Sequence, residues 1–246
     1  MIKENSVKKV AVVLPALNEQ KAASATIKDY ARYFPEAFII LVDNGSNDLT
    51  VSRSLAALDD IDNEGCVLIE HRRGKLNAVK RAFSQYDAMV WVISDCDATY
   101  PARDLREIYD AMILKRFDHG VADRLSNQTY INKSDIKTSV NLFGNFLFTK
   151  ITQFLAGNEH SDVLSGGRVL SNALIRSICF QSEGFEMETE LNLQSHAIGA
   201  ETVYFPIKYK KRPVGSETKL RAFRDGLKIL MFMLKFSVIN RAWLLF

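Results

Sequence analysis

Two aspartates one residue apart, Asp95 and Asp97, follow an apolar run that ends at Ser94. The run begins at Met89 and is rich in β-branched and aromatic residues, which predicts a strand buried on both faces. In open α/β sheets, ligands bind beyond the carboxyl ends of such strands. Two carboxylates there suit Mg²⁺ or Mn²⁺, which bind carboxylate oxygen together with substrate phosphate. A cap on the helix expected near Pro101 explains one aspartate equally well, so the pair alone leaves both interpretations open.

The strand before Asp95 belongs to a regular alternation of apolar runs and helical patterns. Four strand–helix units in succession predict an α/β fold with a mostly parallel sheet, flanked by helices and joined by right-handed crossovers. The expected strands are Val10 to Leu14, Phe38 to Val42, Cys66 to Ile69 and Met89 to Ser94. The expected helices are Gln20 to Phe34, Asp48 to Leu58, Lys75 to Tyr86 and Pro101 to Lys115.

The alternation breaks after about Gly120. The polar stretch 124–138 predicts a loop, and residues 163–170 predict an extended or turning segment. Three further helices are expected over 141–156, 172–179 and 185–198, and two short strands over 202–205 and 207–209. From Lys219 to Asn240, apolar residues at helical spacing alternate with basic ones, which predicts a basic amphipathic helix.

Composition narrows the class of protein. With 246 residues, 47% of them hydrophobic, the chain can bury a sizeable core as one domain or slightly more. Three widely spaced cysteines favour a reducing compartment over a disulfide framework, and the four histidines lack the spacing of a structural zinc site. We also expect neither a signal peptide nor a stretch that crosses a bilayer.

Charge is unevenly distributed along the chain. The net charge is only +3, yet residues 208–241 contain ten Lys and Arg against Glu217 and Asp225. This basic element predicts anionic partners, namely phosphate groups, a membrane surface, or both.

Two other predicted strands also end in polar residues. Glu19 follows the first strand and Asp43 the second, and a parallel sheet brings the carboxyl ends of its strands to one edge. Helix capping explains Asn18 but does not explain Asp43, which directly follows a buried strand. Neither segment contains the glycine patterns of a dinucleotide fold or a P-loop, and the basic glycine-rich loop of a nucleotidyltransferase is absent.

The ordered motifs of the chain resemble family 2 glycosyltransferases, which have the GT-A fold. The motifs that carry this resemblance are Leu14-Pro15-Ala16-Leu17-Asn18-Glu19, Asp43-Asn44-Gly45-Ser46, Arg72-Arg73-Gly74-Lys75 and Asp95-Cys96-Asp97. Later segments are similar to the branch that contains dolichyl-phosphate mannosyltransferases and bacterial polyprenyl-phosphate glycosyltransferases. They are Ala122 to Ser126, Phe143 to Asn145, Asp162 to Gly167, Gly184 to Leu191 and Arg212 to Leu220.

The resemblance implies a role for individual residues. The nucleotide-sugar positions are Pro15, Ala16, Asn18, Glu19, Asp43, Asn44, Lys75, Asp95, Cys96, Asp97 and Arg124. Asp95 and Asp97 are also the implied ligands of Mg²⁺ or Mn²⁺, and Arg212, Ser216 and Lys219 the implied contacts of an acceptor phosphate. The catalytic candidates are Asp97, Asp162, Glu188, Glu190 and Arg212. Asn44 departs from the family, which often has a second acid there, and this puts its role in base recognition in doubt.

The resemblance also implies a domain plan. Residues 1–218 form a GT-A domain, with a nucleotide-sugar half over 1–120 and an acceptor half over 121–218. Residues 219–246 form an amphipathic helix at the membrane interface, where a basic face and a terminal Trp are favourable. Members of the branch often continue into transmembrane helices at this point, so we expect a chain that lacks them or ends before them. The implied location is the cytoplasmic face of the membrane.

The leading hypothesis is an inverting, metal-dependent transferase that moves a sugar from UDP or GDP to a polyprenyl phosphate, with no nucleic-acid partner. The alternative is a GT-A enzyme acting on a saccharide hydroxyl in cell-surface polysaccharide synthesis. A hydroxyl acceptor needs a carboxylate base, whereas a phosphate oxygen is already anionic and needs positioning by cations. A catalytically silent binding module is a third hypothesis. The sequence does not specify the transferred sugar or the nucleotide base of the donor, and it leaves a homo-oligomeric state open.

Overall fold

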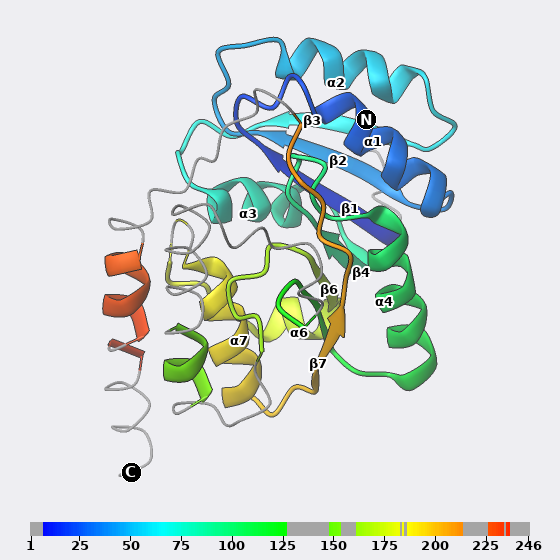
Figure 1. The fold of residues 1–246 in the computed structure, drawn as a ribbon. Helices are drawn as coiled ribbons and strands as arrows, with labels where there is room; N and C mark the ends of the chain where they lie inside the picture. Colours follow the sequence, from blue (N-terminus) through cyan, green and yellow to red (C-terminus); the bar gives the residue numbers. More distant parts are fainter. Residues whose placement is uncertain are drawn as a thin grey trace.

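The computed structural model describes residues 7–126, 148–153, 161–182, 184, 186–213, 226–233 and 235–236. Its centre is a seven-stranded sheet in the order β3-β2-β1-β4-β6-β5-β7, with helices on both faces (Figure 1). Strands pair in parallel except β6, which is antiparallel to both of its neighbours. The predicted α/β fold with a mostly parallel sheet is therefore confirmed.

The first four strand–helix units follow the predicted alternation. Their strands are β1 (Lys8–Ala16), β2 (Phe38–Asp43), β3 (Gly65–Ile69) and β4 (Ala88–Ile93). Their helices are α1 (Ala23–Tyr33), α2 (Thr50–Asp59), α3 (Lys75–Gln85) and α4 (Ala102–Lys115). Because successive side chains of a strand point to opposite faces, Val10, Val12 and Leu14 pack on one side of the sheet and Ala11 and Val13 on the other.

The later part of the sheet departs from the prediction. Strand β5 (His119–Asp123) begins where the alternation was expected to break. Its second residue is Gly120, where a Cβ would lie 2.3 Å from Ile108 Cγ2 of α4, the helix that packs on the strand. The extended segment around Gly166-Gly167 leads into β6 (Arg168–Ser171), followed by α6 (Asn172–Ser177), α7 (Met187–Ala197) and β7 (Thr202–Pro206).

The prediction of a strand over residues 207–209 is wrong. After Pro206 the chain leaves the sheet and crosses toward α4, where the backbone N–H of Lys208 donates to Asp104 Oδ2 at 2.8 Å. The backbone N–H of Lys210 then donates to the carbonyl of Thr99 at 2.8 Å. This path carries Arg212 to the edge where β4 ends.

Each face of the sheet has its own apolar core. Helices α1, α2 and α4 pack on one face around Tyr30 and Leu105, and α3, α6 and α7 pack on the other around Trp91 and Leu191. Residues 148–153 and 226–233 are helical, and together they bury Ile229 with Phe148, Val163, Leu193 and Met233 in a third cluster. Among the described helices, none is long and apolar enough to cross a bilayer.

Candidate active site

The carboxyl ends of the parallel strands meet at one edge of the sheet. β1 lies between β2 and β4, and the strand order reverses between β1 and β4, which is where ligands bind in open α/β sheets. Glu19 follows β1, and Asp95 and Asp97 follow β4, so the predicted acidic residues flank this switch point. Glu19 is 6% exposed and Asp97 1%, so both carboxylates face the interior of the site and not open solvent.

Asp97 is held by a turn and by an arginine from far along the chain. Its Oδ1 accepts hydrogen bonds from the backbone N–H of Thr99 at 3.1 Å and the Thr99 hydroxyl at 2.5 Å. Its buried Oδ2 accepts no hydrogen bond, and Arg212 Nη2 lies 2.6 Å away as an ion pair. Arg212 Nη1 also lies 3.5 Å from Glu19 Oε1, so one guanidinium joins the ends of β1 and β4.

Lys75, at the start of α3, bridges two carboxylates. Its Nζ lies 2.5 Å from Asp95 Oδ1 and 2.6 Å from Glu188 Oε1, at the start of α7. Any side chain at position 166 would displace this pair, because a Cβ there would lie 2.6 Å from Asp95 Oδ2 and 2.8 Å from Lys75 Nζ. The other oxygen of Glu188, Oε2, is buried and accepts no hydrogen bond.

The electrostatic environment shifts the pKa values of the two aspartates in opposite directions. Burial alone would raise the pKa of Asp95, but Lys75, with help from Arg212 and Arg124, holds that pKa below its usual value. Burial and the neighbouring Asp95 charge raise the pKa of Asp97 despite Arg212. Burial lowers the pKa of Lys75, but the charges of Asp95 and Glu188 raise it by more. The net shift of this pKa is therefore upward, and Lys75 keeps its charge.

The acidic residues fit a divalent metal that is completed by substrate. Among the described residues, no group of three His, Cys, Asp or Glu side chains could hold a metal ion. Asp95 and Asp97 together supply carboxylate oxygens, and the buried Asp97 Oδ2 is engaged by the Arg212 ion pair without a hydrogen bond. Mg²⁺ and related cations are commonly bound by one or two carboxylates plus substrate phosphate, so the donor set suits such an ion.

Asp43 and Asn44 build the turn after β2. Asp43 Oδ2 accepts hydrogen bonds from the backbone N–H groups of Gly45 and Ser46, both at 3.1 Å. Asn44 Nδ2 donates to the carbonyls of Glu70 at 3.0 Å and Arg72 at 2.8 Å. Asn44 Oδ1 accepts from the Gly74 N–H at 2.8 Å, so this side chain ties the β2 turn to the loop before Lys75.

The β1 turn packs against the β2 turn. Asn18 has φ 53°, and its side-chain oxygen accepts from the Asn47 N–H at 2.9 Å while its own N–H donates to the Ser46 hydroxyl at 2.8 Å. Pro15 and Ala16 end β1 in register with Val42 and Asp43. Cys96 is 1% exposed and packs in the core on the α1 and α4 face, so its side chain is removed from solvent.

The other acidic candidates are engaged by protein groups. Arg124 binds Asp162 in a two-pronged pair, with Nε 2.7 Å from Oδ2 and Nη2 2.8 Å from Oδ1. Glu190 Oε1 accepts from the Gln181 N–H at 2.6 Å, and its Oε2 from the Ser182 N–H at 3.0 Å and hydroxyl at 2.5 Å. Glu190 therefore fixes the segment before α7. The predicted phosphate contacts Ser216 and Lys219 lie outside the described residues.

Two residues that the sequence analysis did not single out also shape this edge. Asp123, at the end of β5, accepts from the Leu125 N–H at 2.8 Å and from the Ser161 hydroxyl at 2.6 Å. The Tyr100 hydroxyl accepts from the Gly166 N–H at 2.7 Å and so holds the glycine that lies against Asp95. Like Asp43, Asp123 lies at the end of a strand. Its position could not be recognised from the sequence because β5 was not predicted.

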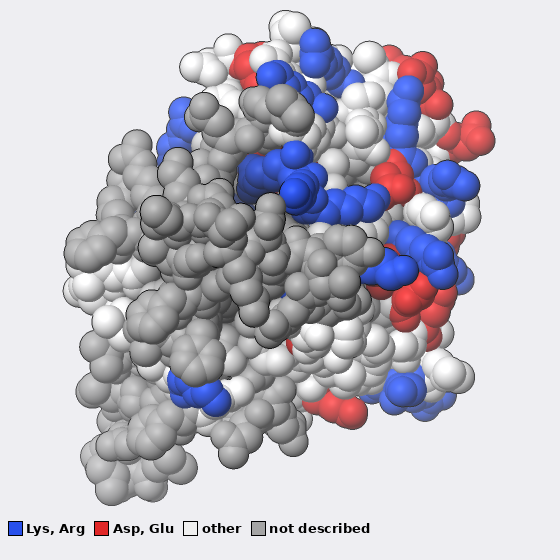
Figure 2. Space-filling model, in the orientation of Figure 1, with Lys and Arg blue, Asp and Glu red and all other residues white. Residues whose placement is uncertain are grey.

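Basic side chains surround this edge. Figure 2 shows Lys and Arg grouped near the centre of the face that Figure 1 presents. Two segments bring basic residues toward the strand ends, 71–75 with Arg72, Arg73 and Lys75, and 208–212 with three lysines and Arg212. The combination of carboxylates that suit a cation and several positive side chains is suited to a ligand with more than one phosphate.

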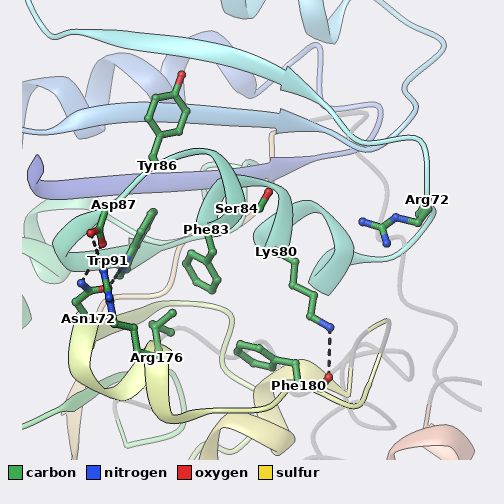
Figure 3. A pocket seen from close by; sticks show the side chains of 11 residues that line it. Arg72, Lys80, Phe83, Ser84, Tyr86, Asp87, Trp91, Asn172, Arg176 and Phe180 are labelled. Atoms are coloured by element: carbon green, nitrogen blue, oxygen red, sulfur yellow. Dashed lines mark hydrogen bonds and ion pairs between the residues drawn. The ribbon is translucent and has the colours of Figure 1, made fainter. Parts of the chain in front are cut away.

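A separate groove lies between α3 and α6 (Figure 3). It has a volume of about 650 Å³ and an aromatic wall of Phe83, Trp91 and Phe180. Lys80 lies at one end, where its Nζ donates to the Phe180 carbonyl at 3.3 Å, and Arg176 pairs with Asp87 at the other. None of the acidic residues of the switch point lines this groove, so it is distinct from the candidate active site.

Comparisons with known proteins agree with this geometry. The model of glycosyl transferase family 2 matches residues 11–179. Glycosyltransferase AglJ of Haloferax volcanii is 30% identical over 218 residues, which cover 88% of this chain and 68% of the relative. A dolichyl-phosphate hexose transferase of the same organism is 27% identical over 234 residues, which cover 94% of this chain and 95% of the relative.

Solved structures share the fold. Glucosyl-3-phosphoglycerate synthase of Mycobacterium tuberculosis, crystallised with Mn²⁺, UDP-glucose and phosphoglyceric acid, superposes with a TM-score of 0.69 at 17% identity. The match covers 94% of this chain and 80% of that structure. With the family match, the relatives and the switch-point geometry in agreement, the chain belongs to glycosyl transferase family 2 and is a glycosyltransferase.

Proposed function

We propose that this glycosyltransferase transfers the sugar of a UDP- or GDP-sugar donor to a polyprenyl phosphate, with inversion at the anomeric carbon. In this proposal residues 1–120 bind the donor and residues 121–218 bind the acceptor. The relative named as a dolichyl-phosphate hexose transferase supports the acceptor class, because it matches this chain over almost the full length of both. The neighbour crystallised with Mn²⁺ and UDP-glucose supports the donor class and a divalent metal.

The observation that carries the proposal is the state of the candidate bases. A hydroxyl acceptor would need a carboxylate that is available to take its proton. Two of the three candidate bases are engaged, because both oxygens of Asp162 are bound by Arg124 and both oxygens of Glu190 hold the 181–182 segment. An acceptor phosphate needs no base, because its oxygen is already anionic near neutral pH and requires positive groups to hold it. Arg212 supplies such a group at the strand ends.

The reaction follows from this arrangement. A phosphate oxygen of the acceptor attacks the anomeric carbon while the bond from that carbon to the donor diphosphate breaks, and the bond electrons leave with the diphosphate. Arg212 and Lys75 stabilise the charge that grows on the leaving group, which lowers the barrier selectively. A divalent cation, held by Asp97 and Asp95 with diphosphate oxygens, would supply further charge stabilisation when bound. Asn44 and Asp43 position the turns that face the nucleoside.

The helix over residues 226–233, here called the C-terminal helix, supports a position of the protein at the membrane surface. Its inner face buries Ile229 and Met233 in the protein, so only part of the predicted apolar face is available to lipid. Its outer face exposes Leu227 and Met231 beside Lys228 and Lys235. Apolar and basic side chains on one exposed face favour binding to an anionic bilayer surface.

An acceptor comparison tests the proposal. The full chain is incubated with radiolabelled UDP- and GDP-sugars, Mn²⁺ or Mg²⁺, and either undecaprenyl phosphate in detergent micelles or a set of soluble saccharides. We expect an organic-phase product from one donor with the lipid phosphate only. Asp97→Ala should reduce that product by at least about a hundredfold, whereas Asp62→Ala, in an exposed loop, should not. Intact lipid transfer by Asp97→Ala with metal present would refute the mechanism.

A saccharide hydroxyl remains the second candidate acceptor, and one observation favours it. Glu188 Oε2 is buried and accepts no hydrogen bond, although Oε1 is held by Lys75. This oxygen is the one carboxylate oxygen among Asp162, Glu188 and Glu190 that could take a proton from a hydroxyl. Turnover on a soluble saccharide that Glu188→Gln abolishes, with none on undecaprenyl phosphate, would establish this alternative.

A further inference from the structure

Arg168, the first residue of β6, is a fully buried cation whose partners are all neutral. Its Nε donates to the Ser165 carbonyl at 2.8 Å, and its Nη1 to His119 Nε2 at 2.9 Å and Asn192 Oδ1 at 3.0 Å. Its Nη2 donates to the carbonyls of Val163 at 3.0 Å and Glu188 at 3.4 Å. Among the described residues, no carboxylate forms an ion pair with it.

The groups around Arg168 do not cancel its charge. A guanidinium has donors only, so His119 Nε2 must accept, and the imidazole is the neutral tautomer with its proton on Nδ1, 3.0 Å from the Ser195 hydroxyl. Asn192 Oδ1 also accepts from the Tyr204 hydroxyl at 3.0 Å. The direct hydrogen-bond partners of Arg168 are therefore all neutral, and burial lowers the pKa of Arg168 although a guanidinium stays charged at neutral pH.

Burial of a charge without a counterion is strongly unfavourable, and natural proteins keep such exceptions mainly at sites that use them. The carboxylates of Glu188 and Asp162 act on Arg168 electrostatically from beyond ion-pair distance. Both belong to the candidate active site, Glu188 through Lys75 and Asp162 through Arg124. The charge of Arg168 thus acts on two carboxylates at the side of the site assigned to the acceptor.

Arg168 also joins the two backbone segments that carry this side of the site. The carbonyls of Val163 and Ser165 belong to the loop that runs from Asp162 to Gly166, which lies against Lys75 and Asp95. The carbonyl of Glu188 belongs to the first turn of α7. Arg168 therefore links the loop to the helix, together with Asn192, whose side-chain amide donates to the carbonyls of Val163 and Glu188 as well.

We propose that Arg168 is a positioning residue for the acceptor, and that its positive charge, which no direct partner neutralises, favours an acceptor that carries a phosphate over a neutral one. The proposal rests on the lipid-phosphate function above. It assigns Arg168 no contact with substrate, because the guanidinium is 0% exposed and its donors are all taken by protein groups.

The decisive variant is Asn192→Asp, which places a carboxylate 3.0 Å from Arg168 with almost no change of shape. The carbonyls of Val163 and Glu188 keep Arg168 but face a carboxylate oxygen in place of the Asn192 donor. A purely structural role predicts at most a shift of the unfolding midpoint, because the counterion gained by Arg168 opposes the repulsion from the two carbonyls, with both KM values unchanged. The proposal predicts a KM for undecaprenyl phosphate raised about tenfold, with the donor KM unchanged.

Two further variants complete the test. Gln85→Glu adds one negative charge at the exposed end of α3 and should leave both KM values unchanged. Arg168→Lys keeps the charge but loses the planar fork, so it should lower the unfolding midpoint and kcat while raising the acceptor KM less than Asn192→Asp does. An unchanged acceptor KM in Asn192→Asp, with wild-type protein active on the lipid, overturns this inference alone. Absence of wild-type turnover on the lipid overturns the proposed function together with the inference.

Discussion

Arg212 and a divalent cation compete for the same carboxylate oxygen. In the structure Arg212 Nη2 lies 2.6 Å from Asp97 Oδ2, so a metal bound there must displace the guanidinium. We expect Arg212→Gln to bind Mn²⁺ about three- to tenfold more tightly without donor, because one partly exposed ion pair is lost, while turnover falls about a hundredfold or more. Electron paramagnetic resonance of free Mn²⁺ measures the affinity, with Arg176→Gln as control. Equal or weaker Mn²⁺ binding would show that the two cations do not exchange.

Asn44 is explained by its hydrogen bonds within the protein. It donates to the carbonyls of Glu70 and Arg72 and accepts from the Gly74 N–H. Asn44→Asp would set a carboxylate against two carbonyl oxygens, so we expect a loss of about 1–3 kcal/mol in the free energy of unfolding. Urea denaturation measures it, and Asn47→Asp, at an exposed position of the same turn, should change it little. Equal stability of the two variants would contradict this role.

The sequence predicted those site residues that directly follow a strand. Asp43, Asp95 and Asp97 follow apolar runs, and the parallel sheet then forces them to one edge. The pairings of these residues could not be predicted, because Arg212 and Glu188 lie far along the chain and only the tertiary fold brings them to this edge. Arg168 carried no signal, since the need for a buried cation depends on three-dimensional neighbours.

At the scale of secondary-structure elements, α7 presents two glutamates with different surroundings. Glu188 pairs with Lys75, whereas Glu190 accepts hydrogen bonds from Gln181, Ser182 and Gln194. We expect Glu190→Gln to lower the free energy of unfolding by about 1–3 kcal/mol, because an amide group would face N–H donors. Glu188→Gln should instead lower kcat with a smaller change in stability. Thermal unfolding and steady-state kinetics on both variants measure these effects.

The exposed Glu201→Gln serves as the control for loss of one carboxylate. A catalytic role for Glu190, as the family resemblance implies, predicts the opposite result, namely an intact fold with turnover abolished.

Elements were predictable to the extent that their periodicity was local. β1 to β4 and the helices that follow them have apolar runs and helical spacing, and their ends agree with the structure to within a few residues. β5 was missed because Gly120 and the polar residues around it break the strand pattern. Close packing against Ile108 is what requires that glycine, and this contact lies twelve residues away in the chain.

At the scale of the whole molecule, we propose that the exposed face of the helix over residues 226–233 brings the enzyme to an acceptor in the bilayer. Leu227 and Met231 are 52% and 63% exposed, one turn apart, beside Lys228 and Lys235. Replacement of both apolar residues by Ser should weaken binding to vesicles of phosphatidylglycerol and phosphatidylcholine about tenfold, since buried apolar area and anionic attraction both contribute.

Cosedimentation with those vesicles measures the binding at low and high salt. Leu114→Ser is the matched control, because Leu114 is 80% exposed and precedes Lys115 and Arg116, yet lies at the end of α4. High salt should release the wild type, because each lysine near the surface contributes about 1 kcal/mol through screened attraction. If the Leu227 and Met231 variant binds vesicles like wild type while Leu114→Ser does not, α4 and not the C-terminal helix is the face turned to the membrane. Turnover on a water-soluble short-chain prenyl phosphate should be the same in both variants, because neither surface contains a residue of the strand-end site.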